Sequence, residues 1–93
     1  MVDKKSIKIL IVDDDRDLCD SLVELFGLTG LNVRGVYNAT DALNIIRNEE
    51  ISIVISDIHM PGKDGVYLLR EIKKHNPNFP KVLFISGQNI SLE

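Results

Sequence analysis

Three separated groups of oxygen-bearing side chains are the residues of this sequence that could do chemistry. They are the aspartates at 13–15, Asp57, and the hydroxyl of Ser86, which Gly87 follows. Carboxylates held close together raise one another's pKa, and a bound cation relieves that repulsion. Oxygen ligands without a Cys or His cluster favour a hard ion, and a few carboxylates with water favour Mg²⁺ over Ca²⁺. The pattern indicates a magnesium site if the fold brings these residues together.

Such a metal would also attract a phosphoryl group and leave one carboxylate as a nucleophile. Each residue alone has a plainer interpretation. Three aspartates before a helix can be an N-cap with acids that favour the helix dipole. Asp57 can be a turn or cap residue, and Ser86 a hydroxyl at the end of a strand. Both interpretations stay open for the single residues.

Short apolar runs alternate with longer amphipathic stretches, and these elements must position the candidate residues. Strands are predicted at residues 9–12, 33–37, 51–57 and 81–86. Helices are predicted at residues 15–29, from 39–41 onward, and at about 64–75. The tail from 88 to 93 carries no predicted element. The alternation predicts an α/β fold with a doubly wound parallel sheet.

Ligands of parallel α/β sheets bind outside the carboxyl ends of the strands. The first predicted strand ends at Asp13, the third at Asp57 and the fourth at Ser86. If these strands are neighbours, their polar side chains converge on one edge of the sheet. The prediction fails if Asp13 and Asp14 lie far from Asp57.

The first predicted helix has apolar side chains at helical spacing, and we expect them to face the core: Leu18, Leu22, Leu25 and Phe26. Cys19 is expected to be a small packing residue rather than a reactive thiol. His59 and His75 are expected to face solvent without a catalytic role for their imidazoles.

Composition narrows the class of protein. We expect a single domain over residues 1–93, with 44% hydrophobic and 27% charged residues, as in ordinary globular proteins. A net charge of −3 argues against direct nucleic-acid binding. No apolar run approaches the about 20 residues that cross a membrane. Without a visible signal peptide, and with one cysteine, the chain is expected in the cytoplasm, away from membranes.

Three stretches, at residues 9–15, 53–65 and 82–87, resemble the receiver domain of two-component response regulators. The resemblance covers nearly the whole chain. It implies a flavodoxin-like fold with strand order 2-1-3-4 for the four predicted strands. It also implies phosphorelay signalling, in which a sensor histidine kinase or phosphotransfer protein donates a phosphoryl group. Such a domain is a phospho-acceptor rather than a conventional enzyme.

The resemblance also implies roles for individual residues. Asp57 matches the aspartate that accepts the phosphoryl group. Asp13 and Asp14 match the acidic pair that holds Mg²⁺ together with Asp57, Asp14 directly and Asp13 largely through water. The backbone carbonyl of His59 matches the remaining protein ligand. Ser86 matches the switch hydroxyl that binds the phosphoryl oxygen.

The sequence departs from the family at its C-terminal end. Receivers carry a fifth strand that ends in a lysine, and two further helices; here these are expected to be missing, because the chain stops at Glu93. Lys63 is not expected to replace that lysine, so we expect weak phosphorylation. An exposed fourth strand is expected to pair, which favours a homodimer formed through that strand or through an exchanged element.

Two other functions fit parts of the pattern. A non-phosphorylated interaction or dimerisation module could retain the fold while its acidic pocket is vestigial. A hydrolase with an aspartyl-phosphate intermediate is disfavoured, because it needs a second acid or base two positions after the nucleophile. His59 occupies that position, but the resemblance gives it a role through its backbone.

Overall fold

A computed structural model describes residues 6–78, 80–86 and 89–92, with only the backbone of residues 86 and 89–92. The strands are β1 (Lys8–Val12), β2 (Asn32–Val36), β3 (Ile53–Asp57), β4 (Lys81–Ser86) and β5 (Asn89–Leu92). The helices are α1 (Arg16–Gly27), α2 (Ala39–Asn48) and α3 (Gly65–His75). The predicted elements are therefore present, with ends that differ by a few residues.

The first four strands are parallel and lie in the predicted order, β2-β1-β3-β4. β1 pairs with β2 on one side and with β3 on the other, and β4 adds to the free side of β3. This is the flavodoxin-like order, with the first and third strands adjacent at the centre. Among the described residues, no helix is long and apolar enough to cross a membrane.

The C-terminal tail forms a strand, contrary to the prediction for residues 88–93. β5 pairs antiparallel with β4, with Asn89 opposite Ser86 and Leu92 opposite Leu83. Only two residues, 87 and 88, separate the strands. So short a connection can join antiparallel strands, whereas a parallel return needs a long crossover. The expectation that β4 is the exposed edge was therefore wrong, and in the described residues β5 is the edge strand.

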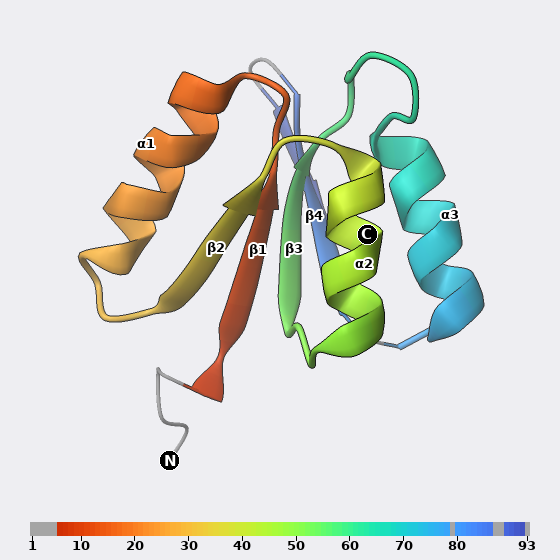
Figure 1. The fold of residues 1–93 in the computed structure, drawn as a ribbon, viewed down its shortest axis with the longest axis horizontal. Coiled ribbons are helices and arrows are strands. Elements are labelled where there is room, and N and C mark those ends of the chain that lie inside the picture. The colour runs from red at the N-terminus through yellow and green to blue at the C-terminus, as the bar shows by residue number, and fades with distance from the viewer. Residues whose placement is uncertain (1–5, 79, 87–88, 93) are drawn as a thin grey trace.

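The sheet is covered on both faces, by α1 on one side and by α2 and α3 on the other (Figure 1). Successive side chains of a strand point to opposite faces, which gives two core clusters. Ile9, Ile11 and Ile55 pack with Cys19 on the α1 side. The cluster on the side of α2 and α3 contains Leu10, Val12, Val54, Leu68, Ile72 and Val82. Burial on both faces explains why the central strands are continuous apolar runs.

α1 is rotated relative to the expected apolar face. Leu18 and Leu25 are 46% and 58% exposed, whereas Cys19 is fully buried. Gly35 of β2 explains the difference, because a Cβ there would lie 2.8 Å from the Cys19 Sγ atom. A glycine on the strand lets the helix approach with its small cysteine innermost. The predicted packing role of Cys19 is confirmed, and the inward orientation of Leu18 and Leu25 was wrong.

Candidate metal centre

The acidic residues lie at the carboxyl ends of the two central strands, at the top of Figure 1. Val12 of β1 pairs with Ser56 of β3, so Asp13 and Asp57 follow at the same level of the sheet. The Asp13 amide also donates a 3.1 Å hydrogen bond to the Val36 carbonyl, which continues the β1–β2 pairing past the end of β1. Pairing of the main chain thus fixes the level in the sheet from which the side chains of Asp13 and Asp57 extend.

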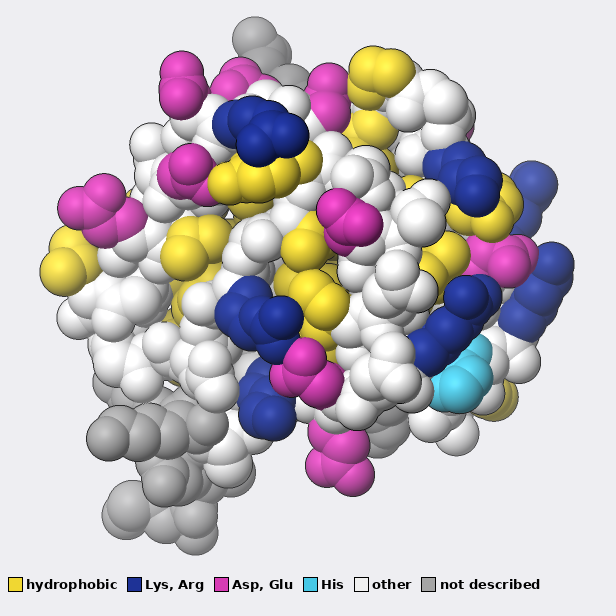
Figure 2. Space-filling view, in the orientation of Figure 1, with side chains coloured by type: hydrophobic (Ala, Val, Ile, Leu, Met, Phe, Trp, Pro, Cys, Tyr) yellow, Lys and Arg dark blue, Asp and Glu magenta, His cyan; other side chains and the backbone are white. Residues whose placement is uncertain are grey.

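The three carboxylates meet, as the sequence predicts. One oxygen from each of Asp13, Asp14 and Asp57 lies within 4.8 Å of the others. Asp13 is buried, Asp14 is exposed and Asp57 is half-buried, so the cluster opens to solvent on one side. Acidic side chains are visible along this upper edge in Figure 2. The spacing is short enough for one small cation to bridge them.

Backbone amides orient two of these carboxylates. The Asp15 amide donates to Asp13 Oδ1 at 3.0 Å, and the His59 amide donates to Asp57 Oδ1 at 3.2 Å. Asp15 has a different role: its Oδ1 accepts from the Leu18 amide at 3.1 Å and caps α1. The interpretation of the acidic run as a helix N-cap is therefore correct for Asp15.

Electrostatics make the cluster costly without a cation. Burial raises the pKa of Asp13 above its ordinary value, and the charges of Asp57, Asp14 and Asp15 raise it further. The Asp15 amide hydrogen bond acts in the opposite direction. A carboxyl group that is both desolvated and surrounded by like charges gains most from a bound cation. An all-carboxylate donor set of this kind fits a hard ion such as Mg²⁺.

The connection from β3 to α3 is a closed loop beside the cluster. Gly62 has a φ of 73°, a conformation that glycine adopts without strain. Met60 of this loop is buried in the core, and Asp64 caps α3 by accepting from the Tyr67 amide at 2.9 Å. The Lys63 ammonium lies 5.3 Å from the centre of the Tyr67 ring on α3.

Ser86 ends β4 at the same edge of the sheet. Asp57 pairs with Ile85, so Ser86 lies one residue beyond the partner of Asp57. The Ser86 hydroxyl is outside the described part of the structure, and Gly87 is outside the described residues. Its predicted role as a switch hydroxyl stays a prediction.

Sequence reasoning missed Ser56, the residue before Asp57. Its side chain is fully buried, and its hydroxyl donates to the Asp57 carbonyl at 2.9 Å. A serine within an apolar strand was the signal, because a buried hydroxyl needs a hydrogen-bond partner.

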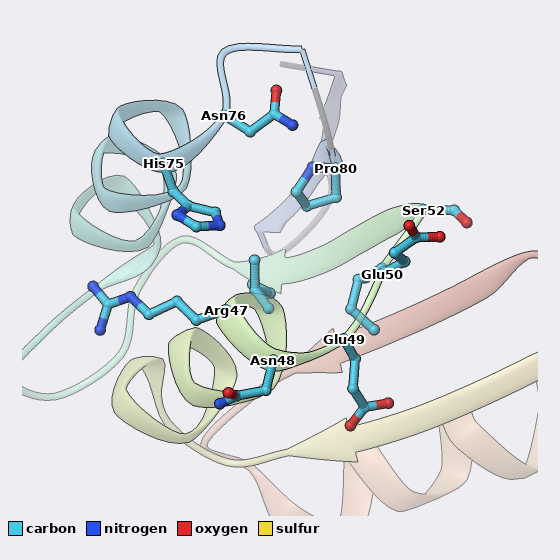
Figure 3. A pocket seen from close by; sticks show the side chains of 10 residues that line it. Arg47, Asn48, Glu49, Glu50, Ser52, His75, Asn76 and Pro80 are labelled. Carbon is cyan, nitrogen blue, oxygen red and sulfur yellow. The ribbon is translucent and has the colours of Figure 1, made fainter.

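A cavity of about 600 Å³ lies at the opposite end of the sheet, between the ends of α2 and α3 (Figure 3). It is lined by charged and polar side chains that include Arg47, Glu50 and His75. Glu49, at its rim, is already paired with Arg34. Ligands of parallel sheets bind at the carboxyl ends of strands, so the acidic cluster is the stronger candidate site.

Comparison with known proteins identifies the family. The profile of the response regulator receiver domain matches residues 9–91. This chain belongs to the response regulator receiver family. Receiver domains of this family are phospho-acceptors rather than conventional enzymes.

Named relatives agree with this assignment. The receiver is 40% identical over 84 residues to the C4-dicarboxylate transport transcriptional regulatory protein DctD of Rhizobium meliloti. It is 41% identical over 76 residues to the response regulator protein FleR of Pseudomonas aeruginosa. These matches cover 90% and 82% of the chain but only 18% and 16% of the relatives. The receiver thus spans less than a fifth of each relative's length.

Solved receivers share the fold. A response regulator receiver domain protein from Clostridium thermocellum superposes with a TM-score of 0.82 at 32% identity, covering 89% of this chain and 67% of that one. The response regulator TrrA from Thermotoga maritima, solved in complex with Mg²⁺-BeF, gives 0.80 at 29% identity, covering 86% and 69%. The predicted fold class is confirmed, and one similar receiver has been solved with the predicted metal.

Proposed function

We propose that Asp57 accepts a phosphoryl group from a phosphohistidine on a sensor histidine kinase or phosphotransfer protein, in a phosphorelay. The observation that carries this proposal is the meeting of Asp57 with Asp13 and Asp14 within 4.8 Å at the carboxyl edge of the sheet. An Asp57 carboxylate oxygen forms the new bond to phosphorus. The phosphorus–nitrogen bond breaks, and its electron pair returns to the imidazole of the donor.

Mg²⁺ is proposed to be held by Asp13, Asp14, Asp57 and the backbone carbonyl of His59. When bound, the ion neutralises charge on the transferring phosphoryl group. The chain itself supplies the orientation of the nucleophile, since the His59 amide holds one oxygen of Asp57. Ser86 is proposed to bind a phosphoryl oxygen and report the phosphorylated state. The solved complex of the similar receiver TrrA with Mg²⁺-BeF supports magnesium binding here.

Phosphorylation is tested by incubating the chain with a small phosphodonor and Mg²⁺, followed by intact mass measurement. We expect one added phosphoryl group, which Asp57→Asn abolishes and Asp17→Asn retains, because Asp17 is exposed on α1 and is not a member of the cluster. Modification that persists in Asp57→Asn, or that is absent from the unsubstituted chain, contradicts the proposal.

The alternative is an interaction module with a vestigial pocket, and Mg²⁺ titration distinguishes the two. Calorimetry of the unsubstituted receiver should show saturable Mg²⁺ binding, because the ion relieves repulsion among three carboxylates. Asp57→Asn should weaken this binding and Asp17→Asn should leave it unchanged. Binding that is absent, or that does not depend on Asp57, favours the vestigial pocket.

We further propose that copies of this chain self-associate through α1 rather than through β4. β5 covers the edge of β4, so the surface first expected for a homodimer is occupied. α1 instead exposes Leu18 and Leu25, and Leu28, which follows the helix, has 80% of its surface accessible. Hydrophobic side chains are visible on the α1 side of the molecule in Figure 2. Exposed apolar surface favours association.

A further inference from the structure

The main-chain carbonyl of Asp57 is contacted from the side opposite α1. Ser56 and Phe84 are register partners on neighbouring strands, and both are buried on the α2 and α3 side of the sheet. The Ser56 hydroxyl donates to the Asp57 carbonyl at 2.9 Å. The carbonyl is therefore held by a group that does not itself belong to the acidic cluster.

Gly65, the first residue of α3, contacts the same carbonyl. A Cβ built on Gly65 would lie 2.5 Å from the Asp57 carbonyl oxygen and 2.9 Å from the Ile58 Cα atom. Both are main-chain atoms, which cannot rotate away as a flexible side chain can. The Gly65 amide also donates to the Ile58 carbonyl at 2.9 Å and closes the loop. Any side chain at Gly65 must therefore displace either α3 or the Asp57 peptide.

We propose that Ser56 and Gly65 are positioning residues for the phospho-acceptor Asp57. The Asp57 peptide is clamped between the Ser56 hydroxyl and the Cα atom of Gly65, and the clamp sets the direction of the Asp57 carboxylate. Asp57 is the last residue of β3, so strand pairing does not fix the main chain that follows it. Rotation of this peptide turns the side chain away from the His59 amide, its partner in the loop.

This inference rests on the proposed function, and its experiment has a readout that does not need phosphorylation. Nuclear magnetic resonance of the metal-free chain gives the amide proton shift of His59, which reports the hydrogen bond to Asp57 Oδ1. The Asp57→Ala variant gives the His59 amide proton shift in the absence of this hydrogen bond. We expect Gly65→Ala to move the His59 shift most of the way to that value.

Gly27→Ala is the matched control. Gly27 is also helical, and a Cβ there meets no atom within 4 Å. The same chemical change should therefore leave the His59 shift unchanged. A folded Gly65→Ala variant with the unsubstituted His59 shift overturns the proposal. If Gly65→Ala does not fold, Ser56→Ala decides in the same way: a displaced shift supports the clamp, and an unchanged shift overturns it.

Phosphorylation by the small donor is the second readout. At saturating donor and Mg²⁺, and at a temperature where both variants are folded, Gly65→Ala should slow modification by roughly tenfold to a hundredfold, because a small misplacement of a reacting group is costly. Gly27→Ala should keep the unsubstituted rate. If the unsubstituted chain is not modified at all, the proposed function fails, and the His59 shift still decides the clamp.

Discussion

At the scale of residues, neighbouring aspartates of one acidic run have different roles. Asp15 caps α1 and Asp13 turns into the cluster, where burial and like charges raise its pKa. In a metal-free receiver the ionised Asp13 is therefore a cost to the folded state. The Asp15 amide hydrogen bond offsets part of that cost.

The sign of this effect predicts a stabilising substitution. Because the pKa of folded Asp13 exceeds its ordinary 3.8, the group stabilises the fold when protonated, and that stability is lost as the pH rises through the folded value. At neutral pH without metal, Asp13→Asn should raise the free energy of unfolding by about 1 kcal/mol, since an amide oxygen can still accept from Asp15. Urea denaturation of both proteins measures this difference in the free energy of unfolding.

The control and the metal dependence sharpen this prediction. Asp17→Asn removes an exposed first-turn acid that favours the α1 dipole, so it should be slightly destabilising.

Added Mg²⁺ should stabilise the unsubstituted chain, because binding to the folded state alone shifts unfolding by mass action. Asp13→Asn should lose much of that gain. A loss of metal-free stability in Asp13→Asn at neutral pH would show that the cost argument is wrong.

At the scale of elements, the approach of α1 to β2 depends on one glycine. A Cβ on Gly35 would lie 2.8 Å from Cys19 Sγ and 2.9 Å from a methyl carbon of Val23. The helix therefore packs directly against the strand backbone. This contact sets the rotation that buries Cys19 and leaves Leu18 at the surface.

Gly35→Ala should force α1 away from the sheet. We expect a loss of about 2 kcal/mol in the free energy of unfolding, as for overpacking of a buried contact. The measurement is a double-mutant cycle by chemical denaturation, in which Val23→Ala opens space and should reduce the penalty of Gly35→Ala. Equal penalties in both backgrounds would place the strain elsewhere.

At the scale of the whole molecule, three elements cover the sheet unequally. α2 and α3 together cover one face, whereas among the described elements α1 alone covers the other (Figure 1). Leu25 on α1 and Leu28, which follows the helix, stay exposed. We expect a second copy to contact this residual apolar surface.

Light scattering of the 93-residue chain at micromolar concentration tests self-association. We expect a mass above that of one chain, and Leu25→Glu should lower it toward one chain by placing a charge in the contact. Val66→Glu, on α3, is the matched control for an exposed apolar residue and should not change the mass. A one-chain mass for the unsubstituted protein with cooperative unfolding would exclude the proposal.

The sequence predicted the acidic site because the signals involved are local. Apolar runs defined β1 and β3, each ended in aspartate, and a parallel sheet places such ends on one edge. Short-range patterns also predicted that α3 begins near residue 64. The parallel strand order entered through the family resemblance and is confirmed.

Tertiary structure decided what depends on neighbours distant in the chain. The pairing of β5 with β4, the rotation of α1 over Gly35, and the contact of Gly65 with Asp57 each involve an approach of two elements. Hydrophobic periodicity indicates that a helix has an apolar side, but the shape of the surface beneath it selects which residue lies innermost. Packing distances of a few ångströms settle these choices, and such distances exist only in the folded chain.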